Sequence, residues 1–376
     1  MRTRVADPEA SNEAARFEAQ KLAFAPLVFQ AARVLRDTGL LERVYHVGAK
    51  GITARELAAA NADAADATSA TPPSLYAVQL LLEAGYAGGL LACASLHEEE
   101  PRFTITKAGV YWQKDALTRV NADFAHAVCY RPAFHLEESL RDGIPAGLRE
   151  LGAFDAAATI YDVLAQLAPE VREAWFEFDH FYSDGMFDTS LDDVLAPPVR
   201  HIVDIGGNTG RFAEVCFARD ATVNVTIVDL PPQVVTIEGR LASFVASGRL
   251  RTQASDVRAH DARLPAGADV YWLSQFLDCF GEEDVVTILR HVRSAMRPDS
   301  RVFIVETFWN EQRFEAARYC VIATSLYFAC VANGRSRMYH SADMRRLVAR
   351  AGLRVVRERH DIGLSHSLLE CSRAPA

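Results

Sequence analysis

A glycine-rich turn constrains the fold of this chain more than any other stretch. Residues 201–212 read His-Ile-Val-Asp-Ile-Gly-Gly-Asn-Thr-Gly-Arg-Phe, and apolar residues then recur at helical spacing to Phe217. The pattern predicts a buried strand, a tight loop and the start of a helix. Glycines let the backbone approach a ligand closely, and a helix N-terminus offers free N–H groups at the same place. The stretch therefore predicts a ligand-binding turn.

A second acid indicates the class of ligand. The β-branched run Asn224–Leu230 contains Asp229, which lies 23 residues after Gly206. An acid at the end of the second strand, about 20 residues past the glycines, is the usual partner of a ribose diol. The dinucleotide fingerprint requires glycines where this chain has Asn208 and Arg211. We therefore predict a nucleoside-binding βαβ unit that is not of the dinucleotide type.

Strand and helix patterns continue to alternate after this unit. Further short apolar runs lie at residues 250–254, 269–274, 301–306, 353–356 and 367–371. Such alternation predicts an α/β fold with an open, mostly parallel sheet and helices on both faces. Ligands of such sheets bind at the carboxyl ends of the strands. The residues expected at that edge are Gly206, Asp229, Asp256, Ser274 and Glu306.

The first part of the chain has the pattern of a winged helix. Helical spacings at 17–37, 53–57 and 72–85 precede a short strand at 103–106. This pattern raises the possibility of DNA binding, but residues 51–115 contain four basic and eight acidic residues, a net charge of −4. The whole chain carries a formal charge of −9. Because phosphates favour a basic face, we expect no nucleic-acid partner.

The cysteine pattern and the hydropathy of the chain indicate the cellular compartment in which the protein resides. The seven cysteines are odd in number and form no Cys-x-x-Cys pair, which argues against a disulfide framework and a zinc site. Residues 1–12 contain no apolar signal segment, and no run of 18 uninterrupted apolar residues occurs. We therefore expect a cytoplasmic protein with no membrane span and no metal.

The motif Asp-x-Gly-Gly-x-x-Gly at residues 204–210 resembles motif I of the class I S-adenosylmethionine-dependent methyltransferases. With the following Asp229-Leu230-Pro231, the chain is similar to the small-molecule O-methyltransferases of the caffeic-acid type. The resemblance implies a Rossmann-like C-terminal sheet, an N-terminal winged-helix dimerisation domain, a homodimer and S-adenosyl-L-methionine as cofactor. The residues that match its cofactor-binding positions are Tyr182, Ser183, Gly206, Asp229, Leu230, Asp256, Val257 and Ser274.

The resemblance also assigns roles to some of these residues. An acid at the position of Asp256 accepts a hydrogen bond from the adenine amino group in the family, and the neighbour at Val257 packs on the ring. An aromatic-rich segment, here residues 175–184, ends in a Ser-Asp pair in the family, and its serine, here Ser183, approaches the methionyl end of the cofactor. Aromatic faces such as that of Tyr182 are compatible with a cationic sulfonium.

The position of the catalytic base departs from the family pattern. The family removes the acceptor proton with a histidine, and alignment on Ile288-Leu289 places Asp278 at that position. Two glutamates assist the histidine in the family. One falls on Glu306, and the other falls near Ser336 and is lost.

Three interpretations of this change remain open. Asp278 is the base for an acidic hydroxyl, such as a phenol or an enol, if burial raises its pKa. Alternatively, Asp278 only orients the substrate, and His180 or His366 is the base. In the third interpretation the acceptor is a nucleophilic carbon, for which a strong base matters less. The catalytic candidates are Asp278, Glu306 and His366.

The sequence as a whole predicts methyl transfer from S-adenosylmethionine to a small acceptor, an aromatic or polyketide-like secondary metabolite. O-methylation is favoured by the resemblance, and C-methylation is the alternative. A catalytically inert relative that binds a ligand or regulates is the alternative of another class. The predicted domains are residues 1–150 for dimerisation, 151–190 for connecting helices that line the acceptor pocket, and 191–376 for cofactor binding and catalysis.

Overall fold

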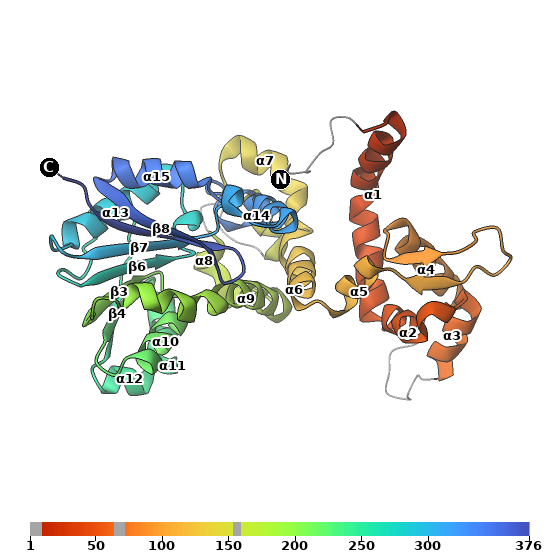
Figure 1. The fold of residues 1–376 in the computed structure, drawn as a ribbon, viewed down its shortest axis with the longest axis horizontal. Helices are drawn as coiled ribbons and strands as arrows, with labels where there is room; N and C mark the ends of the chain where they lie inside the picture. The colour runs from red at the N-terminus through yellow and green to blue at the C-terminus, as the bar shows by residue number, and fades with distance from the viewer. Residues whose placement is uncertain (1–9, 64–71, 153–158, 376) are drawn as a thin grey trace. The chain divides into compact units, whose positions relative to one another are not determined.

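The computed structural model describes residues 10–63, 72–152 and 159–375. The described chain forms two compact units that divide between Asp123 and Phe124 (Figure 1). Residues 124–150, which the sequence places with the dimerisation domain, therefore pack with the C-terminal unit. The predicted limits of the three domains remain a prediction. Most of residues 1–12, where no signal segment is expected, lie outside the described residues.

The N-terminal unit is mostly helical and carries a two-stranded ribbon. Its elements are α1 (Asn12–Asp37), α2 (Leu40–Val47), α3 (Ala54–Asp63), α4 (Leu75–Ala87), β1 (Leu91–Cys93), β2 (Phe103–Ile105), α5 (Lys107–Lys114) and α6 (Ala116–Phe124). The ribbon strands pair antiparallel. Leu35, Leu41 and Leu82 are fully buried in one core between the helices and the ribbon. The predicted order of helices followed by a short strand is confirmed, and β1 is the partner of that strand.

The C-terminal unit is built on a seven-stranded sheet with the order β5-β4-β3-β6-β7-β9-β8. The strands are β3 (His201–Ile205), β4 (Asn224–Asp229), β5 (Leu250–Ala254), β6 (Val270–Ser274), β7 (Arg301–Glu306), β8 (Leu353–Ile362) and β9 (His366–Arg373). The first five are parallel, and β9 runs antiparallel to both β7 and β8. The predicted α/β fold with a mostly parallel sheet is confirmed.

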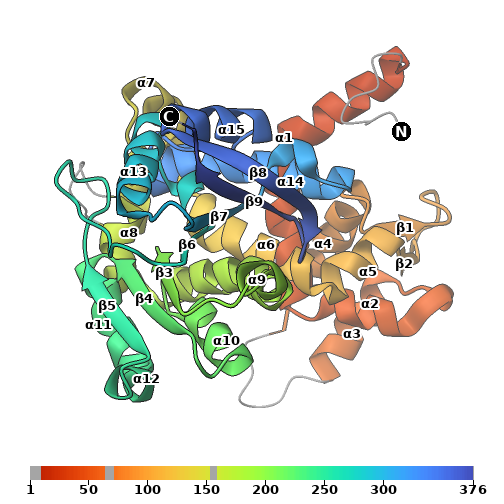
Figure 2. The same ribbon diagram turned by 60° about the vertical axis from the view of Figure 1, so that its left-hand side comes forward.

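Helices cover both faces of this sheet (Figures 1 and 2). Neighbouring strand residues face opposite cores, as Tyr271 and Trp272 of β6 do. The core around Tyr271 is closed by α13 (Glu282–Ala295) and α15 (Ser341–Arg350). The core around Trp272 is closed by α9 (Pro169–Val194), α10 (Arg211–Arg219) and α11 (Pro231–Arg240). A non-helical residue, Leu241, separates α11 from the short helix α12 (Ala242–Ala246).

A third group of helices lies beyond the carboxyl ends of the strands. It comprises η2 (Ala125–Cys129), η3 (Pro132–His135), α7 (Leu136–Asp142), η4 (Ala146–Leu151), α8 (Ile160–Val163), η5 (Leu164–Gln166), α14 (Glu315–Tyr327) and η8 (Phe328–Ala332). Phe124, Ile160, Trp175 and Phe328 are buried together in its core. This aromatic layer supplies the second wall of the site described below.

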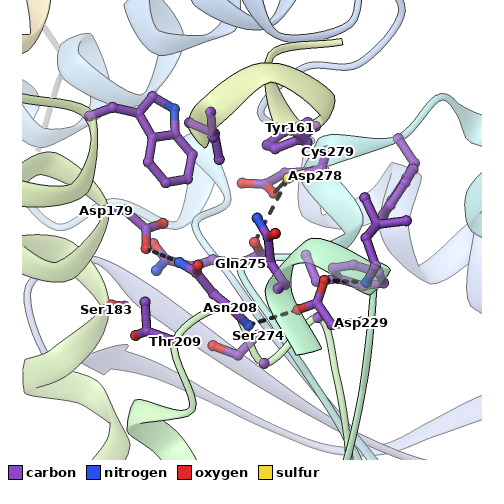
Figure 3. A pocket seen from close by; sticks show the side chains of 18 of the residues that line it. Tyr161, Asp179, Ser183, Asn208, Thr209, Asp229, Ser274, Gln275, Asp278 and Cys279 are labelled. Atoms are coloured by element: carbon purple, nitrogen blue, oxygen red, sulfur yellow. Dashed lines mark hydrogen bonds between the residues drawn. The ribbon is translucent and has the colours of Figure 1, made fainter. Parts of the chain in front are cut away.

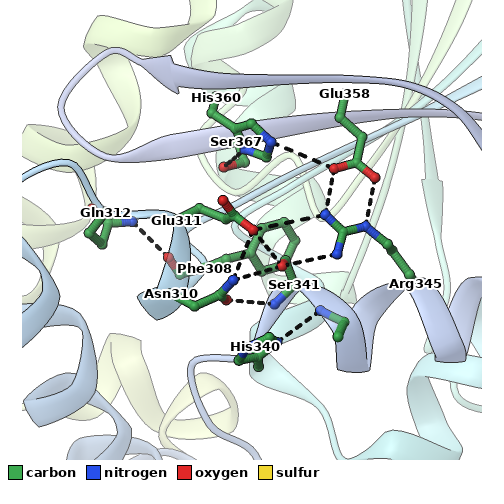
Figure 4. A network of polar contacts seen from close by, with 11 residues as sticks. Phe308, Asn310, Glu311, Gln312, His340, Ser341, Arg345, Glu358, His360 and Ser367 are labelled. Carbon is green, nitrogen blue, oxygen red and sulfur yellow. Dashed lines mark hydrogen bonds and ion pairs between the residues drawn. The ribbon is translucent and has the colours of Figure 1, made fainter. Parts of the chain in front are cut away.

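Polar contacts fasten the segment after β7 to α15 and β8 (Figure 4). The Asn310 side chain donates to the Ser341 hydroxyl at 2.9 Å and accepts from the Ser341 N–H at 2.8 Å. The Arg345 guanidinium pairs with Glu358 at 2.6 Å. These contacts fix the chain that leaves Glu306, the last residue of β7. Within the described part of the chain, no helix has the length and apolar character needed to cross a bilayer.

Candidate active site

The carboxyl ends of β3, β4 and β6 open into one pocket (Figure 3). Its glycine half is lined by the turn after β3 and by polar residues that follow the other strands, with Ser183 and Tyr182 of α9 beside them. Its aromatic half is lined by side chains of the helical layer together with the turn after β6. The rings of that half are Phe124, Tyr161, Trp175, Phe178, Tyr327 and Phe328.

Two glycines keep the turn between β3 and α10 open. Gly206 has a φ of 79°, and a Cβ there would overlap the ring of Phe276. At Gly207 a Cβ would come within 2.6 Å of Ile227 and within 2.8 Å of the Asp204 carboxylate. Larger residues at these positions would therefore fill the turn. With glycine at both, the turn keeps an open cradle that can hold a ligand.

Acids on β3 and β4 face this cradle. The Asp229 carboxylate accepts hydrogen bonds from the backbone N–H groups of Asn208 at 2.9 Å and Leu230 at 2.7 Å. Burial raises the pKa of Asp229 to about 6 against the effect of these bonds. Burial and the nearby charge of Asp229 raise the pKa of Asp204 to about 8. Among the described residues, no partner reaches one Asp204 oxygen or the Ser274 hydroxyl, so both are available to a polar ligand.

The remaining predicted cofactor residues line the same half. Asp256 pairs with Arg258 at 2.8 Å, and the hydrogen bonds from that guanidinium lower the pKa of Asp256. Val257 is buried next to this pair, and Ser183 is buried on α9. The structure thus brings together all the predicted positions: Tyr182, Ser183, Gly206, Asp229, Leu230, Asp256, Val257 and Ser274. Carboxylates for hydroxyl groups, a glycine cradle and unpartnered polar atoms fit a nucleoside with a charged tail.

Asp278 lies in the aromatic half, in the turn η6 (Leu277–Cys279) that follows β6. Its side chain is only 5% exposed, and the Cys279 thiol lies 3.5 Å from one carboxylate oxygen. Burial raises the pKa of Asp278 to about 6, although hydrogen bonds from the thiol and the backbone oppose the shift. The group is therefore mostly ionised at neutral pH and is a stronger base than an exposed carboxylate.

Glu306 lies behind the turn that carries Asp278. One of its carboxyl oxygens accepts from the backbone N–H groups of Phe276 at 3.1 Å and Leu277 at 2.8 Å. Glu306 is not among the residues that line the pocket. Burial, and then the charge of Asp278, raise the pKa of Glu306 well above its usual range, which favours the neutral acid. The geometry makes Glu306 a support for the turn.

The two histidines considered as bases lie in different places. His366 is fully buried at the start of β9, outside the pocket lining, and burial lowers its pKa to about 4. His180 of α9 lines the pocket with its Nε2 3.4 Å from the Thr209 hydroxyl, and burial lowers its pKa. The structure therefore brings His180 to the pocket and leaves His366 in the sheet.

Several lining residues were not predicted as site residues. Asp179 lies one helical turn before Ser183, so the spacing of α9 could have placed both on the pocket face. Tyr161 and Cys279 carried no comparable signal, because only the tertiary fold brings their elements together. Asn333 also lines the pocket, whereas Ser336, near the position of the lost glutamate, is buried. No cluster of three metal-ligating side chains occurs in residues 10–63, 72–152 and 159–375.

Family models match most of the chain. Residues 178–354 match the O-methyltransferase domain, and residues 16–100 match a dimerisation2-like domain. The chain belongs to the S-adenosylmethionine-dependent O-methyltransferases. The O-methyltransferase match begins at Phe178, in the aromatic segment of α9, and includes the glycine-rich turn, Asp278 and Glu306.

Individual relatives of this O-methyltransferase are distant. O-demethylpuromycin-O-methyltransferase of Streptomyces alboniger is 25% identical over 72% of this chain and 70% of its own length. The 8-amino-8-demethylriboflavin N,N-dimethyltransferase of Streptomyces davaonensis is 32% identical, but over 47% of this chain and 49% of its own length. The crystal structure of the S-adenosylmethionine-dependent methyltransferase SibL superposes with a TM-score of 0.67 at 22% identity, covering 95% of this chain and 98% of SibL. This likeness shows a shared fold.

Proposed function

We propose that this protein transfers the methyl group of S-adenosylmethionine to a hydroxyl oxygen of a small aromatic metabolite. The observation that carries the proposal is the buried carboxyl of Asp278 in an aromatic cavity that is continuous with the glycine half. The rings of Phe124 and Phe178 stack at 4.0 Å, and the Trp175 indole N–H donates to the Tyr327 hydroxyl at 2.7 Å. Ordered rings of this kind favour a planar apolar acceptor.

The glycine half would hold the cofactor. Asp229 would accept hydrogen bonds from the ribose hydroxyls, and Asp256 would accept from the adenine amino group. Ser183 and Ser274 would lie at the methionyl end. When bound, S-adenosylmethionine supplies a methyl group activated by its positive sulfonium. The ring of Tyr182 supports such a cation.

Asp278 would act as the general base. The Asp278 carboxylate would accept the proton of the acceptor hydroxyl as its oxygen takes the methyl group, whose bond to sulfur breaks so that S-adenosylhomocysteine is the leaving group. Burial raises the pKa of Asp278 to about 6 and so makes this transfer easier. Glu306 would hold the turn in place by accepting hydrogen bonds from two backbone N–H groups. The aromatic walls would align the acceptor oxygen with the methyl group.

The test uses S-adenosylmethionine labelled with carbon-13 on its methyl group and a panel of naphthols and hydroxyquinolines. We expect the label on an acceptor oxygen, identified by nuclear magnetic resonance of the product. A carbon-bound label would contradict the proposal and favour the C-methylation alternative. Tight cofactor binding with no turnover on any acceptor would instead support an inert ligand-binding relative.

We further propose that the protein is a homodimer held together by its N-terminal unit. The match of residues 16–100 to a dimerisation-like domain supports this proposal. Apolar side chains of α1, among them Leu22 and Leu27, are exposed by 77% and 68%. Exposed apolar patches of this kind mark interaction surfaces. The cytoplasmic location expected from the sequence remains a prediction.

A further inference from the structure

The acids of the pocket fall into two groups. Asp204 and Asp229 belong to the glycine half, and the charge of Asp229 adds to the effect of burial in raising the pKa of Asp204. Asp179 belongs to the other group. Burial is the main cause that raises its pKa, to about 7, and the charges that add to the shift are those of Asp278 and Asp184. The charge of the proposed base therefore acts on Asp179 across the pocket.

Asp179 is held on one side only. One carboxylate oxygen accepts from the Asn208 side-chain amide at 2.9 Å, while the Asn208 backbone N–H donates to Asp229 at 2.9 Å. Among the described residues, no donor reaches the other oxygen of Asp179. Figure 3 shows Asp179 and Asp278 projecting into the same pocket from α9 and from the turn after β6. Asp179 is partly buried in the pocket lining, and this second oxygen is the acceptor that it can offer to an O–H or N–H group of a ligand.

Among the described lining residues, no unpaired guanidinium or ammonium group is present to neutralise Asp179, and burial favours the neutral form of the neighbouring His180. Within the described residues, the arginines of the pocket lining are Arg211 and Arg258, and the lining contains no lysine. Arg211 forms an ion pair with Asp184, and Arg258 forms one with Asp256. A ligand with a carboxylate beside Asp179 would meet like charge in a poorly solvated cavity. A ligand with an O–H or N–H group would satisfy the free oxygen.

We infer that Asp179 is a specificity-determining residue, which binds a second hydroxyl or amino group of the acceptor while Asp278 faces the hydroxyl that is methylated. The acceptor is then an aromatic molecule with two hydrogen-bond donors and no carboxylate near α9. Trp175 and Phe178, on the same helix, would cover the ring between the two groups. This inference rests on the proposed function, because it takes the aromatic half as the acceptor site.

The test measures binding without turnover. Full-length protein loaded with S-adenosylhomocysteine is titrated by calorimetry with 1-naphthol, with naphthalenediols and with aminonaphthols. We expect the best two-donor probe to bind the wild-type protein at least about tenfold more tightly than 1-naphthol, as one well-placed additional hydrogen bond provides. In Asp179→Asn one accepting oxygen becomes a donor, so the preference should fall to within about threefold. Asp179→Glu keeps the carboxyl and should retain the direction of the preference.

Asp188→Asn is the matched control, since Asp188 is exposed on the same helix and the charge change is identical. It should keep the tenfold preference. Equal binding of all probes by the wild-type protein, or binding of none, would contradict the inference. So would an unchanged preference in Asp179→Asn. A tenfold loss of S-adenosylhomocysteine affinity in Asp179→Asn with the preference intact would assign Asp179 to the cofactor and overturn the inference.

These outcomes are separate from those of the proposed function. A lost preference in Asp179→Asn with no methylated product from any probe would support the inference and contradict O-methylation. Oxygen-methylated products formed equally from 1-naphthol and the diols, with equal affinities, would support O-methylation and contradict the role of Asp179.

Discussion

At the scale of single residues, the proposed proton transfer depends on the protonation of two carboxyl groups, one in the turn after β6 and one that supports this turn from β7. The structure places Asp278 in the pocket and Glu306 behind it, and burial raises the pKa of both. Burial gives Asp278 a pKa of about 6, whereas burial together with the charge of Asp278 raises the pKa of Glu306 well above its usual range. These shifts favour a neutral Glu306 beside an Asp278 that is mostly ionised at neutral pH, which is the form the proposed base requires.

The pH dependence of turnover follows from this assignment. A base acts in its ionised form, so kcat/KM for a phenolic acceptor should be low at pH 5 and rise through an apparent pKa of about 6 to a plateau above pH 7. Initial rates measured between pH 5 and 8 check this. A rate that is flat over that range would exclude Asp278 as the titrating base.

Substitutions of Glu306 separate support from proton transfer. The amide introduced by Glu306→Gln mimics the neutral acid, and its oxygen still accepts from the backbone N–H groups of Phe276 and Leu277. We therefore expect kcat within about threefold of the wild type and an acidic limb of the pH profile that stays near pH 6. Glu306→Ala leaves both N–H groups without their acceptor and should lose most activity. A shift of the acidic limb by a full pH unit in Glu306→Gln would show that Glu306 is charged in the working enzyme.

At the scale of elements, the turn between β3 and α10 is the part of the site that its own sequence determines. Gly206 has a positive φ and packs against Phe276, the residue that leads into the Asp278 turn. Gly206→Ala should therefore strain the backbone and displace the Phe276 ring. We expect at least a tenfold loss of S-adenosylhomocysteine affinity, measured by calorimetry, and a lower Tm.

Gly239→Ala is the control for this prediction. Gly239 lies on the exposed side of α11 with a negative φ, and nothing lies within 4 Å of a Cβ built there. It should leave cofactor affinity unchanged and raise or maintain the Tm, since alanine favours helix more than glycine does. Equal affinities for Gly206→Ala and the wild-type protein would contradict the close packing described for the turn.

The glycine half was predictable because its signals are local. Residues 201–257 contain the turn, Asp229 and Asp256, and parallel strands bring their carboxyl ends to one edge by topology alone. The aromatic half was predicted only in part. Tyr161 and Tyr327 lie 166 residues apart on short helical segments, and nothing in either segment indicates the other. The place of Asp179 in the sequence also could not show that one of its oxygens lacks a hydrogen bond, because this depends on which donors the fold brings near the carboxylate.

At the scale of the whole molecule, the N-terminal unit should carry the dimer contacts. A double substitution of Leu22→Glu and Leu27→Glu places charge on the exposed apolar side of α1. We expect the wild-type protein to be a dimer and the double variant to be a monomer by light scattering at micromolar concentration. Val235→Glu, on the exposed face of α11 in the C-terminal unit, is the control and should remain a dimer. A monomeric wild-type protein would contradict the proposal.

The most direct test of the account is the rate of the chemical step in Asp278→Asn. Asparagine keeps the size of the side chain and removes its ability to accept a proton. With a phenolic acceptor that the wild-type protein methylates, single-turnover methyl transfer should fall by about 10²–10⁴ while S-adenosylhomocysteine affinity stays within about twofold. A loss of only a few-fold in the single-turnover rate would contradict the assignment of Asp278 as the general base.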